Sequence, residues 1–336
     1  MKNRITDIAG IRIGNAHDAA LASGVTALVF DKPSVASIAI HGGAPGGRDT
    51  ALLEPDMTVG QVDALVLSGG SAFGLDSMGG VQARLREQGR GFQIGNMRVP
   101  IVPGAILFDL LNGGDKNWSH KPPYWDLGYA AACNANVEFE LGTVGAGFGA
   151  TTVNLKGGLG SASARTSGGF TVGALVAVNA IGSAIIGKGP HFWAGCYERD
   201  NEYGGLGVPA NFGPDALRLA SKGGASPRNE NTTIAIVATD ASLDKGQTKR
   251  LAVMAHDGMG RALRPSHAAF DGDTVFAAAT GTAGSPTMGD ILEIGALAAD
   301  CLARAIARGV YEARALPFAG AVPDWKAVFA ASPGKG

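Results

Sequence analysis

The sequence predicts a mixed α/β fold of packed layers (α+β) rather than a doubly wound parallel sheet. Strand-like and helix-like segments follow one another without the strict alternation that a parallel sheet requires. Apolar residues make up 46% of the 336 residues and charged residues 17%, so the chain can bury a sizeable core. The length allows one large domain or two modest ones, and no fixed-period repeat divides it.

Short apolar runs bounded by turn residues predict the strands. They are Val25–Phe30 and Ser34–Ile40, joined by a turn at Pro33, then Ala64–Leu67, Ile101–Phe108, Thr171–Asn179, Ser183–Ile186, Thr232–Thr239 and Thr274–Ala279. Capping residues and apolar side chains at three- and four-residue spacing predict the helices. These are Leu75 to about Glu87, Trp125 to about Asn134, a helix after Asp244 to about Leu263, and Met288 to about Arg308.

Glycine is the outlier of the composition, because 52 glycines are about 15% of the chain, roughly twice the usual share. The clusters at Gly145–Gly149 and Gly157–Gly160 match neither a dinucleotide-binding motif nor a P-loop, so they predict compact loops. Between residues 204 and 231 the composition shifts to Gly, Pro, Asn and Ser, which predicts a linker.

Charge and cysteine usage exclude several classes of protein. The net charge is −1 and no basic run exceeds two residues, so the electrostatic footprint of a nucleic-acid-binding protein is absent. Cys133, Cys196 and Cys301 are too widely spaced for a disulfide framework or a metal motif. The N-terminus has no apolar signal core and no segment reaches ~20 apolar residues. We therefore expect a cytoplasmic protein without a membrane partner.

Two candidate sites have simpler structural explanations. Ser71 lies in a G-x-S-x-x-G turn, one residue longer than a nucleophile elbow, so a packing turn is favoured over catalysis or anion binding. The six histidines form no paired metal-binding motif. His256, on a predicted helix, and His267, in a turn near Pro265, are expected to be structural. No metal is expected.

The junction between Asn231 and Thr232 suggests a more specific hypothesis, a catalytic threonine exposed by chain cleavage. A polar loop is followed directly by a hydroxyl residue that opens a buried strand. If the chain were cut there, Thr232 would gain an α-amine with an ordinary pKa of ~7.7–8.0, a general base beside its own nucleophile. The alternative is a strand that simply begins with two threonines. Asp271 and Asp273 could polarise that amine, bind Ca²⁺ or form a turn, and by themselves they favour a turn.

Several motifs, in order along nearly the whole chain, resemble the DmpA-like family of self-processing aminopeptidases and amidases. This family includes D- and β-aminopeptidases and the nylon-oligomer hydrolases. The matching segments are Ile5–Gly14, His41–Thr50, Leu67–Asp76, Val102–Asp109, Gly145–Gly147, Asn231–Ile234 and Phe270–Phe276. The resemblance implies a four-layer αββα sandwich like that of N-terminal-nucleophile hydrolases. It also implies one domain, 1–336, that cleaves itself into 1–231 and 232–336 and needs no cofactor.

The resemblance also implies roles for individual side chains. Thr232 would be the nucleophile and, through its amine, the base, and Asn179 would donate a hydrogen bond to the oxyanion. Asp271 and Asp273 would orient the nucleophile, and Lys156 would adjust the charge around it. Where some members place a tyrosine hydroxyl near the oxyanion, this chain has Phe108, whose ring cannot donate. The resemblance is stronger to the nylon-hydrolase branch of the family, because of Thr232, Lys156 and the aspartate pair.

The expected reaction is amide hydrolysis through an acyl-enzyme. Its substrates would be small peptides or amides of ω-, β- or D-amino acids, 6-aminohexanoate oligomers included. A buried carboxylate near Thr232 would favour an aminopeptidase, and an open cleft would favour an oligomer hydrolase. The resemblance implies a homo-oligomer, with a tetramer favoured. The alternative function is a non-catalytic small-molecule-binding or assembly protein that uses the glycine-rich loops.

Overall fold

The computed structural model describes residues 1–222 and 231–330. Its main sheet has nine strands, in the order β3–β7–β4–β2–β11–β10–β9–β8, with β1 paired to β2. The strands are β1 (Ile11–Asp18), β2 (Ser23–Ile40), β3 (Gly47–Arg48), β4 (Val62–Ser68), β7 (Gly104–Ile106), β8 (Leu159–Arg165), β9 (Thr171–Asn179), β10 (Thr232–Ala241) and β11 (Thr274–Gly284). A separate hairpin is formed by β5 (Phe92–Ile94) and β6 (Met97–Val99).

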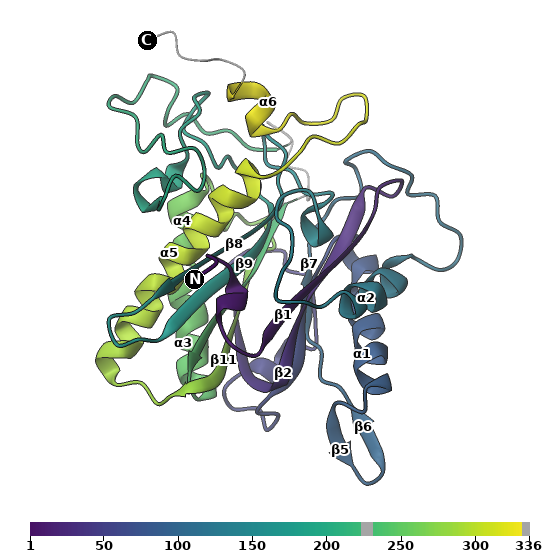
Figure 1. Cartoon of the computed structure of the whole chain (residues 1–336). Helices are drawn as coiled ribbons and strands as arrows, with labels where there is room; N and C mark the ends of the chain where they lie inside the picture. The colour runs from purple at the N-terminus through teal and green to yellow at the C-terminus, as the bar shows by residue number, and fades with distance from the viewer. Residues whose placement is uncertain (223–230, 331–336) are drawn as a thin grey trace.

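The helices lie on the outside of this sheet (Figure 1). They are α1 (Ser77–Glu87), α2 (Tyr124–Cys133), α3 (Lys245–Ala255), α4 (Asp257–Ala262), α5 (Met288–Tyr311) and α6 (Trp325–Phe329). Asp244 caps α3 and Thr287 caps α5, each by accepting a backbone N–H from the first turn of its helix. Within residues 1–222 and 231–330, no helix is both long enough and apolar enough to cross a bilayer.

The long strand β2 connects two layers of the sheet. Its first half pairs with β1 and β4, and its second half, Val35–Ile40, pairs with β11. The prediction of two strands with a turn at Pro33 is therefore wrong. Pro33 lies outside these registers, where the pairing with β4 shifts between Val29 and Ser34, so its missing N–H costs no ladder hydrogen bond.

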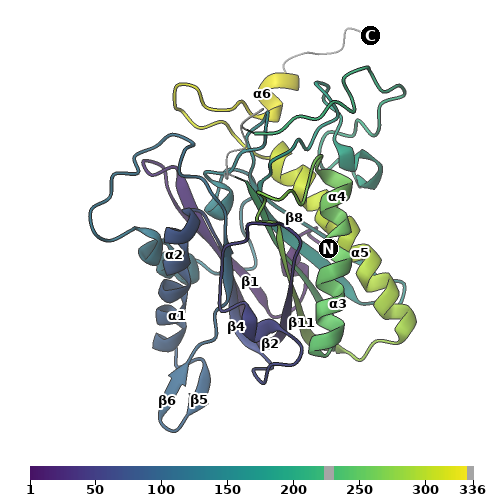
Figure 2. The same cartoon turned by 180° about the vertical axis from the view of Figure 1, so that it is seen from behind.

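Side-chain alternation along β10 shows how the layers stack. Ile234, Ile236 and Ala238 point into a core shared with β1, β2 and β4, whereas Ala235 and Val237 point into a second core shared with α3, α4 and α5. A third core joins α1 and α2 to β1, β2 and β4. Figure 2 shows the two helical layers on opposite sides of the strands. The four-layer αββα prediction is confirmed.

Close backbone approach explains one strand that the sequence pattern hides. The stretch after Gly157 was expected to be a loop, yet β8 runs from Leu159 to Arg165 against α5. A Cβ on Gly160 would lie 1.9 Å from the carbonyl oxygen of Ala305, so only glycine lets this strand and helix pack so closely.

Other differences concern the edges of elements. Only Gly104–Ile106 of the expected strand Ile101–Phe108 is a strand, and Ser183–Ile186 forms isolated bridges instead. The helix expected after Asp244 is divided at His256 into α3 and α4. Of the predicted linker between residues 204 and 231, the part at 223–230 lies outside the described residues.

Candidate active site

Three strand ends converge at Thr232, the first residue of β10. Thr232 pairs with Asn179, the last residue of the neighbouring strand β9. On its other side, Asn231 forms a bridge with Asp271, shortly before β11 begins. Thr232 is only 5% exposed. The sheet thus brings the candidate nucleophile, the candidate oxyanion donor and the aspartate pair together.

The Thr232 hydroxyl faces the peptide bond that precedes it. Its Oγ1 donates to the carbonyl oxygen of Asn231, and the same oxygen accepts the backbone N–H of Gly272 at 3.1 Å. A Cβ on Gly272 would lie 2.8 Å from both Oγ1 and Cγ2 of Thr232, so the position requires glycine. Sequence reasoning missed this donor, because the Asp-Gly-Asp segment by itself favours a turn.

The two aspartates differ in their environments, although both are buried. Oδ1 of Asp273 accepts the N–H of Thr233 at 2.9 Å, and Oδ2 accepts the backbone N–H and the ring Nδ1–H of His267. Burial acts to raise the pKa of Asp273, but these hydrogen bonds lower it overall. Burial and the neighbouring Asp273 raise the pKa of Asp271. The two opposite shifts favour a proton on Asp271 over one on Asp273.

Behind Asp273 lies a group of three histidines. The His41 and His256 rings stack with centroids 3.8 Å apart, and His267 meets both edge-on. Burial lowers the pKa of His256 to about 4 and also lowers the pKa of His41. Residue spacing gave no sign of this group, because His41 comes from the other end of the chain.

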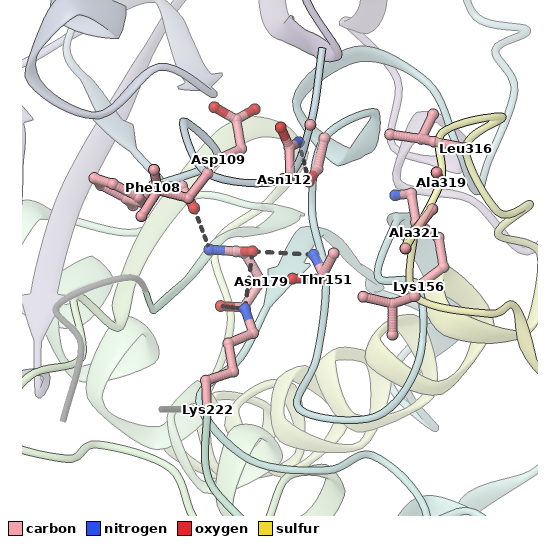
Figure 3. A pocket seen from close by; sticks show the side chains of 15 residues that line it. Phe108, Asp109, Asn112, Thr151, Lys156, Asn179, Lys222, Leu316, Ala319 and Ala321 are labelled. Carbon is pink, nitrogen blue, oxygen red and sulfur yellow. Dashed lines mark hydrogen bonds between the residues drawn. The ribbon is translucent and has the colours of Figure 1, made fainter. Parts of the chain in front are cut away.

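A pocket of about 250 Å³ lies on the other side of Asn179 (Figure 3). Its polar lining includes Asp109, Lys156, Asn179 and Lys222. Asn179 thus lines the pocket and also pairs with Thr232 across the two strands. The arrangement places a substrate-sized space beside the strand end that carries the hydroxyl.

The Asn179 amide is held in one orientation. Its Nδ2 donates to the Phe108 carbonyl oxygen at 2.9 Å, and its Oδ1 accepts the Thr151 N–H at 3.0 Å and Lys222 Nζ at 3.1 Å. Phe108 therefore contributes a backbone carbonyl that orients Asn179.

Lys156 is buried in the wall of the pocket, where its Nζ donates to the carbonyl oxygens of Gly147, Ala150 and Gly157 at 2.7–3.0 Å. Three acceptors favour the ammonium form, whereas burial lowers the pKa of the amine to about 7. Lys156 clamps the glycine-rich loop that forms the pocket. The structure thus brings it near Asn179 but directs its amine at this loop.

Two further charged side chains at the pocket were not among the predicted site residues. Asp109 is 2% exposed and accepts Ser23 Oγ at 2.7 Å and the Gly70 N–H at 2.8 Å. Burial raises its pKa. The other is Lys222, at the end of the described part of the linker. Nearby, the Ser71 amide donates to the Leu107 carbonyl, within the turn that packs against Asp109.

The four-layer αββα frame thus places a hydroxyl, an amide and two carboxylates at adjoining strand ends beside a pocket. The family model described as "Peptidase family S58" matches residues 3–321. The chain belongs to peptidase family S58. The prediction of an amide-hydrolysing enzyme is thereby confirmed over the non-catalytic alternative.

Several proteins of related sequence carry names that agree with this family. Uncharacterized aminopeptidases of Mycobacterium bovis and Mycobacterium tuberculosis are 41% identical, over 97% of this chain and 98% of theirs. A 6-aminohexanoate-oligomer endohydrolase of Agromyces sp. is 28% identical, over 84% of this chain and 76% of its own length.

Solved structures show the same fold. A Burkholderia sp. beta-aminopeptidase aligns with a TM-score of 0.70 and 21% identity, over 97% of this chain and 91% of its own. An L-aminopeptidase D-Ala-esterase/amidase from Ochrobactrum anthropi aligns with a TM-score of 0.69 and 20% identity, over 98% and 93% of the two chains. The latter is described as a variant of the N-terminal-nucleophile hydrolase fold.

Proposed function

We propose that this protein cleaves itself before Thr232 and then acts as an N-terminal-threonine aminopeptidase on small peptides or amides. One observation carries the proposal. The Thr232 hydroxyl contacts the carbonyl of its own preceding peptide, and that carbonyl also accepts the Gly272 N–H. A nucleophile and a hydrogen-bond donor thus meet at the bond to be cut.

Maturation begins when Thr232 Oγ1 attacks the Asn231 carbonyl carbon. The Gly272 N–H stabilises the resulting oxyanion, and the aspartate pair takes the hydroxyl proton. The carbon–nitrogen bond then breaks, the Thr232 nitrogen receives the proton, and an ester remains. Water hydrolyses this ester and releases the chains 1–231 and 232–336. We assign the base to the aspartates because the Lys156 amine is committed to three carbonyl oxygens.

Turnover reuses the same hydroxyl. The freed α-amine of Thr232 accepts the proton while Oγ1 attacks the substrate carbonyl and forms an acyl-enzyme. The Asn179 amide donates to the developing oxyanion, a bond of the kind worth roughly 2.7–4 kcal/mol in the transition state. The amine product takes the proton and leaves, and water then releases the acyl group.

Asp109 supports an aminopeptidase rather than an oligomer hydrolase. It supplies a buried carboxylate in the wall of the pocket that Asn179 lines. A substrate ammonium entering this pocket would favour the charged form of Asp109 and pair with it. Hydrolysis of ω-amino-acid oligomers is the second candidate. The resemblance of Thr232, Lys156, Asp271 and Asp273 to the nylon-hydrolase branch supports it.

The decisive experiment is intact-mass analysis with N-terminal sequencing of freshly expressed protein. We expect two fragments, with the smaller one beginning at Thr232. Thr232→Ala should give a single uncut chain and lose at least roughly 10³-fold in activity, because both nucleophile and base disappear. Thr232→Ser keeps the hydroxyl and serves as the matched control, which should still be cut. An active wild-type chain that remains whole would contradict the proposal.

We also propose a homo-oligomer, with a tetramer favoured, in the cytoplasm. The hairpin β5–β6 supports association, since it leaves the body of the molecule and exposes four apolar side chains, Phe92, Ile94, Met97 and Val99 (Figure 1). Light scattering should report a multiple of the chain mass. Substituting Phe92→Asp together with Ile94→Asp should reduce that mass, and an unchanged mass would exclude the hairpin as the interface.

A further inference from the structure

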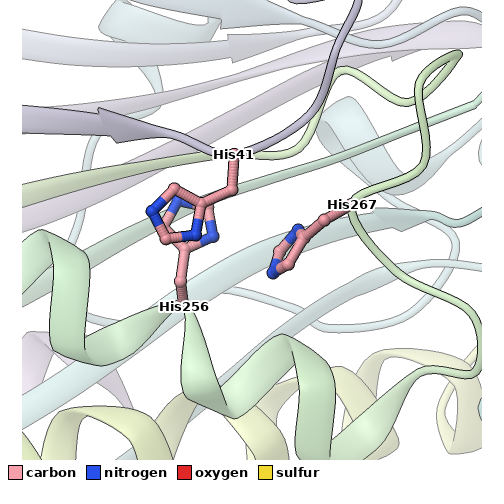
Figure 4. A group of neighbouring side chains, drawn as sticks. All are labelled: His41, His256 and His267. Atoms are coloured by element: carbon pink, nitrogen blue, oxygen red, sulfur yellow. The ribbon is translucent and has the colours of Figure 1, made fainter.

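Three segments far apart in the sequence bring imidazole rings together. His41 follows β2, His256 separates α3 from α4, and His267 lies in the loop before β11. Figure 4 shows the His41 and His256 rings stacked, with His267 facing them. One ring nitrogen from each of the three lies within 4.8 Å of the other two.

The tautomer of His256 follows from one hydrogen bond, which leaves a lone pair on the other ring nitrogen. Its Nε2 lies 2.9 Å from the Ala39 carbonyl oxygen, which can only accept, so Nε2 carries the proton. The lone pair is then on Nδ1. This atom is buried and has no hydrogen-bond partner among the described residues, while His256 as a whole is 2% exposed. A buried polar atom without a partner costs free energy, so its retention calls for a ligand.

The tautomer of His267 is fixed in the same way. Its Nδ1 lies 2.8 Å from Oδ2 of Asp273, so Nδ1–H donates to the carboxylate and the lone pair is on Nε2. A histidine whose second nitrogen donates to a carboxylate or a backbone carbonyl is the usual arrangement around a protein-bound metal. Here the Asp273 carboxylate accepts the Nδ1–H of His267, and the Ala39 carbonyl accepts the Nε2–H of His256.

We propose that His41, His256 and His267 bind one divalent transition-metal ion of the zinc class. Three neutral imidazoles suit Zn²⁺ or Co²⁺, whereas Mg²⁺ and Ca²⁺ prefer oxygen ligands. His41 is exposed, which gives the ion a route from solvent. Three protein ligands leave a fourth tetrahedral position for water.

The ion would act as a positioning element, apart from the hydrolytic step. Asp273 connects the two sites, because one of its oxygens accepts from His267 and the other from the N–H of Thr233, next to the nucleophile. Metal binding to His267 would hold that ring, and with it Asp273, in the orientation seen here.

The test is a titration of chelator-treated, full-length, untagged protein with Co²⁺, followed by its visible absorption, and with Zn²⁺ in competition. We expect one ion per chain, a tetrahedral Co²⁺ spectrum and a rise in Tm on Zn²⁺ binding. His41→Ala should weaken binding by at least roughly 100-fold, because it removes one of the three ligands at an exposed position. His120→Ala, at an exposed histidine elsewhere, is the matched control and should bind as the wild type does.

Two results would overturn the proposal. One is wild-type protein that takes up no Co²⁺ or Zn²⁺ at one ion per chain. The other is binding that His41→Ala and His267→Gln both leave unchanged, which would place the ion elsewhere. Because the titration measures binding alone, it also gives an answer on the uncut Thr232→Ala chain. A failure of the proposed self-cleavage therefore leaves this test intact.

Discussion

Asn179 separates two regions of very different construction. On one side, Thr232, Gly272 and the aspartate pair are buried or closely packed, and the hydrogen bonds described above join them through backbone atoms and carboxylates. On the other side lies a pocket of about 250 Å³ whose wall carries Asp109 and Lys156. We propose that the first region moves protons and that the second holds a ligand.

This difference teaches how the proposed enzyme can act on two substrates. Self-cleavage needs only the packed region, because the scissile bond is already part of it. Turnover of an external substrate needs the pocket as well. Substitutions in the two regions should therefore separate maturation from substrate binding, and the following predictions test that separation.

The largest effect is expected in the packed region. Asp271→Asn should slow self-cleavage by roughly 10³-fold, since it removes the proton acceptor. The pKa of Asp271 is raised by burial and by Asp273, so the acid must lose its proton before it can act as a base. The wild-type rate should then increase as pH rises through neutrality.

Cell-free synthesis followed by transfer to buffers of different pH would measure this rate on a denaturing gel. Asp56→Asn, at an exposed aspartate, is the control and should cleave normally. A wild-type rate that falls with rising pH would remove Asp271 from the role of base.

A smaller effect is expected in the pocket. Asp109→Asn should raise KM by roughly 100-fold for substrates with a free amine, because a buried charge pair is lost. Self-cleavage should be unaffected, and so should the hydrolysis of an N-acetylated substrate. Steady-state kinetics on the two substrates would measure the difference. Equal losses on both would show that Asp109 supports the fold rather than the ammonium.

The smallest effect concerns the loop clamped by Lys156. Lys156→Met removes one donor from three buried carbonyl oxygens, of which those of Gly147 and Ala150 keep a backbone N–H donor, and should lower the free energy of unfolding by about 2 kcal/mol. Urea denaturation in the Thr232→Ala background would measure it on one continuous chain, with Lys188→Met as the exposed control. Lost activity at unchanged stability would instead favour the catalytic role that the resemblance implies.

The same lysine predicts a pH dependence of stability. Burial lowers the pKa of Lys156 from 10.5 to about 7. Between these values the unfolded chain binds more protons than the folded one, so this group makes wild-type stability increase with pH across that window. The increase should be absent in Lys156→Met.

Much of the fold could be predicted from local pattern. The apolar run of β10 and the cap at Asp244 are signals within one segment; β10 forms as expected and α3 begins at its cap, although the expected helix is divided at His256. Strands β2 and β8 were harder, because their form depends on partners. In the sequence Pro33 predicts a turn, but in the structure it lies within one long strand that pairs with different strands on either side of it. In the sequence Gly160 predicts a loop, but in the structure it lies in a strand against which α5 packs.

The site shows the same division. The junction at Thr232 and the two aspartates are short, contiguous motifs, and the sequence could indicate them, although their proposed roles still await experiment. Long-range contacts alone bring the remaining site residues into place: Asp109, Gly272 and the three histidines. His41 and His256 stack because β2 and α3 pack together, and no spacing rule connects them.

The position of β10 and β11 between β9 and β2 has a consequence for the life of the molecule. A cut before Thr232 would leave the smaller fragment holding two interior strands and the larger one holding the strands on both flanks. Neither fragment contains the whole sheet. The native order of strands would then form only once, during the folding of the uncut polypeptide. After full denaturation, recovery would require two separate molecules to find each other, so dilution should suppress it.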